Sequence, residues 1–302
     1  MRYKNHFCFN ITKYISKLKK LFKTNLLIIL KYMHKNPHLL YINEIDLEII
    51  AKTKSESYIH ADPYPHVVLD NIFDEKILND ILDDFPKNLN EIGKNFNNSV
   101  EKKLSLNKSH MFTNNINSFI NFLNSQTFLN FLQELTGIKE KLIPDPYLVG
   151  GGIHELKNEG YLNIHSDFNM HPTMKLDRRL NILIYLNKNW DKNYGGSLEL
   201  WDKKMERCVQ KISPDFNRMV IFSTTDYSYH GNPDKVNCSK NNSRKSIAMY
   251  YYSNGRPNYE KKLGPHSTIF RKRPNQNEPD GSIEFKKIFG QLYIRRKKKI
   301  KK

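Results

Sequence analysis

Two histidines and one aspartate have the types and the spacing to hold a metal ion. His165 and Asp167 are separated by one residue, so on a β-strand their side chains leave the same face. His230 lies far along the chain and completes the set if a distant strand folds back beside the first two. Two imidazoles and one carboxylate on a β-scaffold bind a divalent iron ion from one side and leave its other coordination positions free. The spacing therefore predicts an iron site.

A buried cation is expected in the same place. Arg244 opens an apolar segment soon after His230, so its guanidinium can project into the same barrel. A guanidinium is a planar, permanently charged fork that suits a carboxylate. Metal ligands and cation together predict a site for iron and a dicarboxylic co-substrate.

Five ordered segments carry a family resemblance. They are His165-Ser166-Asp167, residues 180–187, residues 195–200, Tyr229-His230-Gly231 and Arg244-Lys245-Ser246. Through them the stretch 150–257 resembles the Fe(II)- and 2-oxoglutarate-dependent oxygenases, in particular the branch with the prolyl 4-hydroxylase catalytic domains. Residues 63–70 resemble the N-terminal strand of that family more weakly. The ordered set, with predicted strands between its members, is far more specific than a single His-x-Asp.

The resemblance implies a complete co-substrate site. His165, Asp167 and His230 are the implied iron ligands and catalytic residues, and Arg244, assisted by Ser246, is the implied partner of the distal carboxylate of 2-oxoglutarate. Tyr185 is placed near the same carboxylate, although it can also be a core aromatic residue. Asn181 shares a strand face with Tyr185 by period two and is a candidate lining residue. The implied cofactors are Fe(II), 2-oxoglutarate and O2, with ascorbate as a candidate reductant.

The implied activity is that of a 2-oxoglutarate-dependent dioxygenase. Such an enzyme releases succinate and CO2 and hydroxylates an unactivated C–H bond, here of a peptidyl proline, another amino-acid or a glycan-linked substrate. One alternative is a non-catalytic jelly-roll binding module, although such a module has no need for an open-sided iron triad beside a cation. Another is a nucleobase demethylase, but the near-neutral body offers no basic groove for specific nucleic acid.

The net charge of +18 is concentrated at the two ends of the chain. Residues 1–43 and 295–302 contain basic residues and no acidic one. Residues 11–33 have apolar positions at helical spacing, which predicts a basic amphipathic helix. This helix either contacts a membrane surface peripherally or packs on the body, and both basic ends can equally reflect a Lys-, Asn- and Ile-rich composition. Oligomeric state is left open.

Cysteine use and hydropathy bear on the compartment. Cys8, Cys208 and Cys238 are scattered and form no CxxC pair, which favours a reducing environment. The apolar run 26–30 is far shorter than the roughly 20 residues of a membrane span, and no small-residue cleavage site follows it. We therefore expect a soluble, cytoplasmic protein.

The body reads as a mainly β, α+β domain with a double-stranded β-helix, that is, a cupin-like jelly-roll core. We expect an N-terminal extension over residues 1–61, the oxygenase domain over 62–260 and a basic tail over 261–302, in which 269–270 can pack back. Within the domain, helices over about 74–137 support a core over about 142–256, because period-two strands begin after residue 147. The polar segment 87–108 reads as a long loop.

Four further residues are candidates without a firm spacing argument. His171 is a rival metal ligand, because it follows Asp167 by four positions, or a residue of a loop over the site mouth. Arg178, Arg179 and Trp201 are candidate mouth residues.

Overall fold

The computed structural model describes residues 42, 44–260, 263–288 and 291–296, with side chains as far as Asp280. The predicted helix over 11–33 and the basic end 297–302 lie outside this part of the chain. No helix among the described residues is both long and apolar enough to cross a membrane.

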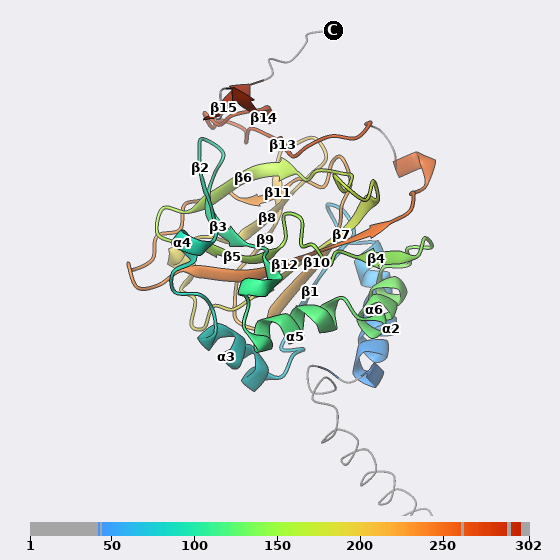
Figure 1. Ribbon diagram of the computed structural model, residues 1–302. Helices are drawn as coiled ribbons and strands as arrows, with labels where there is room; N and C mark the ends of the chain where they lie inside the picture. Colours follow the sequence, from blue (N-terminus) through green and yellow to red (C-terminus); the bar gives the residue numbers. More distant parts are fainter. Residues whose placement is uncertain (1–41, 43, 261–262, 289–290, 297–302) are drawn as a thin grey trace, which may run out of the picture. The chain divides into compact units, whose positions relative to one another are not determined.

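Antiparallel strands form most of the fold (Figure 1). Their bounds are β1 His66–Asp70, β2 Lys94–Asn97, β3 Glu101–Leu106, β4 Leu142–Pro144, β5 Gly152–Leu156, β6 Tyr161–Ser166, β7 Asp177–Tyr185, β8 Leu198–Trp201, β9 Cys208–Ile212, β10 Arg218–Ser223, β11 His230–Asn232, β12 Arg244–Ser253, β13 Ile269–Phe270, β14 Gly281–Ile288 and β15 Gln291–Arg296. The strands predicted at 66–69, 180–186, 197–201, 208–212, 219–222 and 246–252 are all present, within three residues of the expected ends.

The strand order explains how the sheet encloses a site. The main ladder runs β1-β10-β7-β12-β5-β3-β6-β11-β8-β9, and β3 pairs with both β5 and β6. The two halves face each other across the interior, because the ring of Phe222 on β10 lies 4.6 Å from that of His230 on β11. This is the jelly-roll architecture that the sequence predicts.

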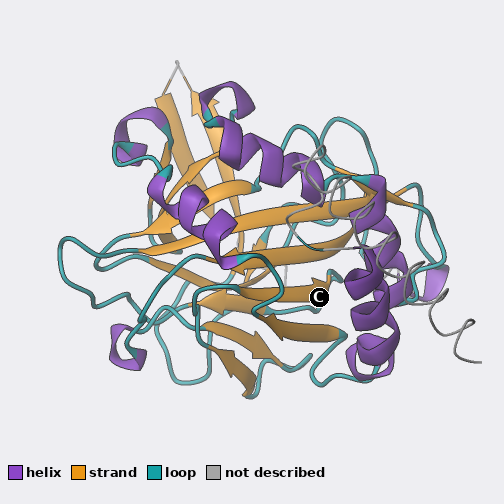
Figure 2. Cartoon of the chain, turned by 90° about the horizontal axis from the view of Figure 1, so that it is seen from below, coloured by secondary structure: helices purple, strands orange, loops and turns teal. Residues whose placement is uncertain are grey.

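Helices pack on the outer face of the sheet (Figure 2). Their bounds are α2 Glu44–Ile59, α3 Glu75–Asp83, α4 Leu89–Ile92, α5 Asn114–Leu123 and α6 Gln126–Thr136, with short 3-10 turns η2 Ser109–Met111, η3 Lys192–Tyr194 and η4 Asn258–Glu260. On β12, Tyr251 points away from the interior, and its hydroxyl donates to the carbonyl of Leu123 at 2.8 Å. Its ring lies 6.4 Å from that of Phe128. The aromatic residues of α5 and α6 are therefore core residues, as predicted.

Local signals set the ends of α5 and α6. The Ser125 hydroxyl accepts a hydrogen bond from the backbone N–H of Phe128 and caps the start of α6. Gly137 ends the helix in the left-handed conformation, with φ of 66°, which is accessible to glycine without steric cost. The predicted helical stretch is therefore two helices, stopped at the expected glycine.

The N-terminal boundary differs from the expected extension over 1–61. Helix α2 belongs to the compact unit that begins at Glu44. Its buried residues Leu47, Ala51 and Tyr58 face the body, and the Tyr58 hydroxyl lies 2.8 Å from that of Ser223. Packing of this face against α6 gives the segment a structural role in the domain.

Segment 87–108 is not a long loop, and this prediction was wrong. It contains α4 and the hairpin β2–β3. Val100, Leu104 and Leu106 are buried on one face of β3, whereas Glu101, Lys103 and Ser105 alternate with them on the other. The polar face lines a cavity, which explains why the segment lacks the hydrophobic content of an ordinary strand.

Candidate metal and co-substrate site

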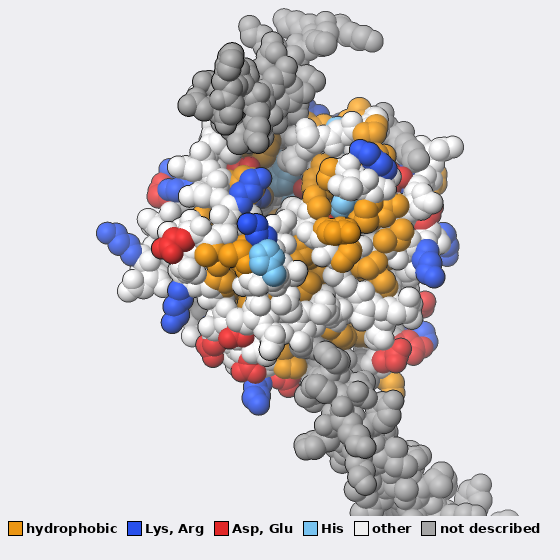
Figure 3. All heavy atoms as spheres, in the orientation of Figure 1, with side chains coloured by type: hydrophobic (Ala, Val, Ile, Leu, Met, Phe, Trp, Pro, Cys, Tyr) orange, Lys and Arg blue, Asp and Glu red, His pale blue; other side chains and the backbone are white. Residues whose placement is uncertain are grey.

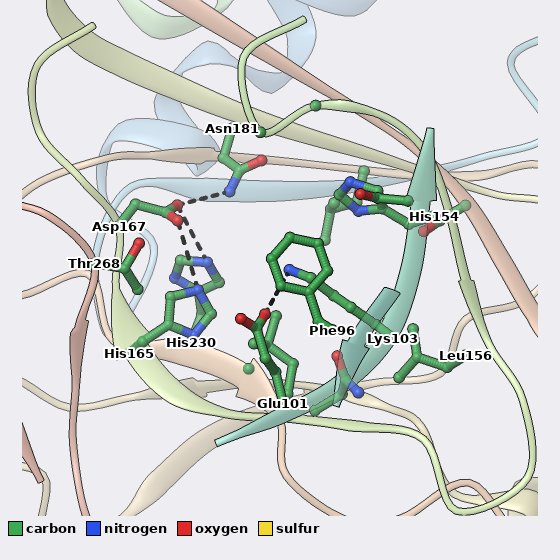
Figure 4. A pocket seen from close by; sticks show the side chains of 18 of the residues that line it. Phe96, Glu101, Lys103, His154, Leu156, His165, Asp167, Asn181, His230 and Thr268 are labelled. Carbon is green, nitrogen blue, oxygen red and sulfur yellow. Dashed lines mark hydrogen bonds and ion pairs between the residues drawn. The ribbon is translucent and has the colours of Figure 1, made fainter. Parts of the chain in front are cut away.

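The three predicted metal ligands converge (Figure 4). His165 on β6 lies directly opposite His230 on β11, and Asp167 follows the end of β6. One ligand atom of each residue lies within 4.8 Å of the others, and all three side chains are buried. The strand pairing thus brings together residues that are far apart in the sequence.

Backbone carbonyls orient both imidazoles. Nδ1 of His165 lies 2.8 Å from the carbonyl oxygen of Asn163, and Nδ1 of His230 lies 2.9 Å from that of Ser228. Because a carbonyl can only accept, each Nδ1 carries the proton and each Nε2 keeps its lone pair. The two Nε2 atoms face Asp167, at 3.5 Å for His165 and 3.4 Å for His230. This tautomer is the one that binds a metal through Nε2.

The charges of the triad also suit a divalent cation. Burial lowers the pKa of His230 to about 4, so its imidazole is neutral near neutral pH. Burial alone raises the pKa of Asp167, but Arg178 and the two histidines outweigh it and hold the pKa well below its usual range. A carboxylate and two imidazoles that turn their Nε2 atoms toward it fit Fe(II).

Two neighbours hold the Asp167 carboxylate. Its Oδ2 accepts a hydrogen bond from Nδ2 of Asn181 at 3.0 Å and lies 2.9 Å from a terminal nitrogen of Arg178. The Arg178 guanidinium is stacked between the rings of Phe168, at 4.4 Å, and Tyr250, at 3.5 Å. Asn181 lines the cavity, as expected, but its amide nitrogen is used on the metal ligand. Arg178 is fully buried beside Asp167, so the prediction that placed it at the mouth was wrong.

Arg244 lies at the other end of the same cavity. It begins β12, is buried, and donates from Nε to the carbonyl of Gly196 at 2.7 Å and from a terminal nitrogen to the hydroxyl of Tyr185 at 3.3 Å. Gly196 has φ of 69°, and a Cβ there would lie 3.0 Å from Cδ of Arg244, so a glycine is needed for this approach. Ser246 lies opposite Tyr185 in the strand register. The four residues predicted around the co-substrate carboxylate therefore share one interior face.

The Arg244 end fits an anionic ligand. Within the described part of the chain, no carboxylate lies within ion-pair distance of this buried guanidinium. A buried charge without a counter-ion is costly, and a ligand carboxylate would relieve that cost. Two further buried atoms that face the cavity, Oδ1 of Asn181 and Nδ2 of Asn232, lack hydrogen-bond partners among the described residues. A polar ligand is needed to satisfy them.

A cavity of about 400 Å³ joins the triad to Arg244. Figure 3 shows basic and histidine side chains around a hollow in this face. Sequence reasoning missed two parts of the wall: the polar face of β3, and His154 on β5, whose pKa burial lowers to about 3 with help from Lys103 and Arg244. For β3 the available signal was the period-two alternation of apolar and polar residues. For His154 there was no signal, because its position has no distinctive spacing.

The chain after residue 261 also contributes to the site. Strand β13 pairs with β6, so that Phe270 lies opposite His165 with the two rings 5.5 Å apart. Ser267, Thr268 and Phe270 line the cavity. The expected return of residues 269–270 to the body is confirmed, and it closes one side of the metal site.

His171, the rival candidate metal ligand, has a structural role. His171 is 1% exposed, accepts hydrogen bonds from the backbone of Thr173 and Met174, and has its Nε2 3.7 Å from Asp145. It is neither a fourth ligand nor a mouth residue, because the loop after β6 turns its ring inward against Tyr252, at 5.2 Å.

Arg179 and Trp201, the other candidate mouth residues, do not line the cavity. Arg179 pairs with Glu140 at 2.7 Å, and it is buried because alternate residues of β7 face opposite sides of the sheet. Trp201 packs with Ile164 and Tyr229, and its indole nitrogen donates to Glu199 at 2.9 Å.

Comparisons with known proteins agree with this geometry. Residues 151–252 match the model of the 2OG-Fe(II) oxygenase superfamily. Mouse (Mus musculus) prolyl 3-hydroxylase OGFOD1 is 30% identical over 79 residues, which are 25% of this chain and 14% of that protein. The chain therefore matches only a small part of the length of this curated relative.

Two solved structures resemble the fold. One is a prolyl hydroxylase from Trichoplax adhaerens in complex with a hypoxia inducible factor oxygen degradation domain peptide fragment. It gives a TM-score of 0.52 at 16% identity, and the match covers 69% of this chain and 91% of the T. adhaerens chain. A prolyl 4-hydroxylase from Phytophthora capsici gives a TM-score of 0.51 at 17% identity, and the match covers 70% of this chain and 65% of the P. capsici chain. These likenesses confirm the predicted double-stranded β-helix. The segment 151–252 therefore matches the 2OG-Fe(II) oxygenase superfamily, and the fold around the His-Asp-His triad is prolyl-hydroxylase-like.

Proposed function

We propose that this protein is an Fe(II)- and 2-oxoglutarate-dependent dioxygenase that hydroxylates an unactivated C–H bond. The observation that carries the proposal is the pairing, in one cavity, of a preorganised metal triad with a buried guanidinium that has no carboxylate partner among the described residues. A binding module gains nothing from an uncompensated buried cation, whereas a dicarboxylate co-substrate supplies the missing charge.

Each end of the cavity has a defined task. Nε2 of His165, Nε2 of His230 and the Asp167 carboxylate would hold Fe(II), while Arg178 and Asn181 fix the carboxylate. Arg244, with the hydroxyls of Tyr185 and Ser246 on the same face, would bind the far carboxylate of 2-oxoglutarate. In this superfamily the iron, with O2, supplies the oxidative decarboxylation that yields succinate and CO2.

The protein's own contribution is positioning and exclusion of water. Phe270, Leu183 and Leu198 add apolar side chains to the lining of the cavity. Such side chains favour a substrate that displaces water from the cavity.

The proposed substrate class is broader than one residue type. The names of the relatives support a prolyl residue of a peptide, and another amino-acid or a glycan-linked carbon is proposed beside it. In the described residues the thiols of Cys208 and Cys238 are free, which supports our proposal that the protein works in a reducing compartment such as the cytoplasm.

The test is an anaerobic titration with Fe(II) and 2-oxoglutarate, followed by the weak visible charge-transfer band of the ternary complex. We expect a band in the wild type, none in His230→Ala, and a requirement for far more 2-oxoglutarate in Arg244→Ala. Absence of the band in folded wild-type protein would contradict the proposal and favour a jelly-roll binding module.

A further inference from the structure

A charged pair in the cavity has no role in holding the metal or the co-substrate. Glu101 and Lys103 on β3 both point inward, with Oε2 of Glu101 3.1 Å from Nζ of Lys103. Their side chains are 11% and 16% exposed. Figure 4 shows Glu101 between the triad and Lys103, so the pair belongs to the wall of the cavity beside the triad.

Both charges keep unused binding capacity. Within the described residues Lys103 is the one ion-pair partner of Glu101, although a carboxylate can accept about four hydrogen bonds and an ammonium can donate three. Lys103 also lies near the ring of Phe96, 5.0 Å from its Nζ, and close enough to His154 to lower the pKa of that imidazole. Nζ of Lys94 lies 4.4 Å from the same Phe96 ring. A partly buried ion pair of this kind contributes little to stability, because desolvation offsets the attraction. Stability is therefore a weak reason for its presence.

The co-substrate does not need these charges. A divalent ion on the triad leaves two positive charges after Asp167 and its ion-pair partner Arg178 are counted, and Arg244 adds a third. The two carboxylates of 2-oxoglutarate cancel two of these three. The pair on β3 is itself neutral, so it remains as a dipolar surface facing whatever binds next to the metal.

A dipolar surface selects a dipolar ligand. A ligand cation would pair with Glu101 and a ligand anion with Lys103, but the two charges are 3.1 Å apart, so a ligand with only one charge would also meet the like charge at close range. A substrate that carries both charges on groups bonded to one carbon can present its ammonium to Glu101 and its carboxylate to Lys103.

We propose that Glu101 and Lys103 recognise the main-chain charges of a free α-amino acid, whose side chain then carries the C–H bond to be hydroxylated. This inference rests on the proposed function and narrows its substrate to an amino acid with free ammonium and carboxylate groups. Peptide-bonded residues lack both charges and are disfavoured by the same pair.

The first experiment measures binding, with Mn(II) in place of Fe(II) so that no turnover occurs. Full-length protein is loaded with Mn(II) and 2-oxoglutarate, and this complex is confirmed by the paramagnetic resonance of Mn(II). The twenty free amino acids, their N-acetyl amides and short peptides are then screened by ligand-observed NMR. We expect at least one free amino acid to bind about tenfold or more tightly than its blocked form, since hydrogen bonds to charged groups contribute about 1.5–3 kcal/mol.

Variants assign the two charges separately. Glu101→Gln should reduce the preference for a free ammonium about tenfold, and Lys103→Met should do the same for a free carboxylate. Lys102→Met removes an exposed lysine from the opposite face of the same strand and should leave binding unchanged. Retained binding of Mn(II) and 2-oxoglutarate shows that each variant is folded.

The outcomes separate this inference from the proposed function. If the Mn(II) and 2-oxoglutarate complex forms but no free amino acid binds, or blocked forms bind equally well, the inference is overturned and the proposed function stands. Wild-type affinity in both Glu101→Gln and Lys103→Met would overturn it as well. If the complex itself fails to form in the wild type, the proposed function and this inference fall together.

Discussion

The two ends of the cavity are built in different ways. At the metal end each imidazole is oriented by the carbonyl of the residue two positions earlier on its own segment, Asn163 for His165 and Ser228 for His230. At the co-substrate end Arg244 depends on contacts from distant segments, the carbonyl of Gly196 and the hydroxyl of Tyr185. The orientation of each imidazole is therefore set locally, although strand pairing is needed to bring the two histidines together. The co-substrate end takes even its side-chain orientation from distant segments, because β7, β12 and the segment before β8 must be aligned.

This difference predicts that the two ends can be disabled separately, and the metal end should show the largest effect. His230→Ala removes one of three ligands. We expect metal affinity to fall by more than about 100-fold, since loss of a residue that merely supports a ligand already costs about 10- to 100-fold. Isothermal titration with Mn(II) measures this, and His110→Ala, at an exposed position, is the control. Unchanged affinity would mean that the triad is not the metal site.

Arg244→Met should spare the metal and disable the co-substrate. Removing one partner of a buried charge pair costs about 2–5 kcal/mol, so 2-oxoglutarate affinity should fall about 30-fold or more. Mn(II) affinity should stay within about twofold. Titration of 2-oxoglutarate into the Mn(II)-loaded protein checks both values, with Arg207→Met, at an exposed arginine, as the control. Equal loss of both ligands would show that the ends are not independent.

Asn181→Ala decides which end this residue serves. Its amide donates to the metal ligand Asp167, so we expect about a tenfold loss of Mn(II) affinity. The affinity of the metal-loaded protein for 2-oxoglutarate should change less. The reverse pattern would restore Asn181 to the role of a co-substrate residue, which the sequence first suggested.

Tyr185→Phe removes only the hydroxyl that accepts from Arg244. The partner is a charged guanidinium and the distance is long, at 3.3 Å, so we expect the low end of the range for hydrogen bonds to charged groups, about 1.5 kcal/mol, and a fall in 2-oxoglutarate affinity of about tenfold. The same titration as for Arg244→Met measures it. No change would indicate that Tyr185 is a core aromatic residue whose hydroxyl plays no part in binding.

His154 should affect the stability of the fold and its pH dependence, not the binding of either ligand. Burial lowers its pKa from 6.5 to about 3, so the unfolded chain binds a proton at higher pH than the folded protein does. The contribution of the neutral ring is complete above pH 6.5 and is lost as the pH falls toward 3. In urea unfolding of metal-free protein, His154→Gln should lose less free energy of unfolding than the wild type between about pH 7 and pH 4. His60→Gln, at an exposed position, should follow the wild type.

Period-two patterns and ordered motifs sufficed to predict the triad, the arginine and the jelly-roll strands. They did not predict strand β3, because most of its residues are polar. Lys103 and Ser105 lie on β3 with their side chains toward the cavity. A strand with polar residues on its cavity face has the composition of a loop, so a single sequence does not reveal it. Arg178 and Arg179 show the same limit, because adjacent arginines on β7 point to opposite sides of the sheet and only one reaches Asp167.

The sequence by itself determined which residues can bind iron and a carboxylate, because residue type and strand period are local properties. Only the tertiary structure decided that Asn181 and Arg178 hold Asp167, that His171 turns away, and that Glu101 and Lys103 face the metal. Those outcomes depend on strand register and on the position of β3 between β5 and β6. Pairing between distant strands is a property of the whole chain, so no local pattern encodes it.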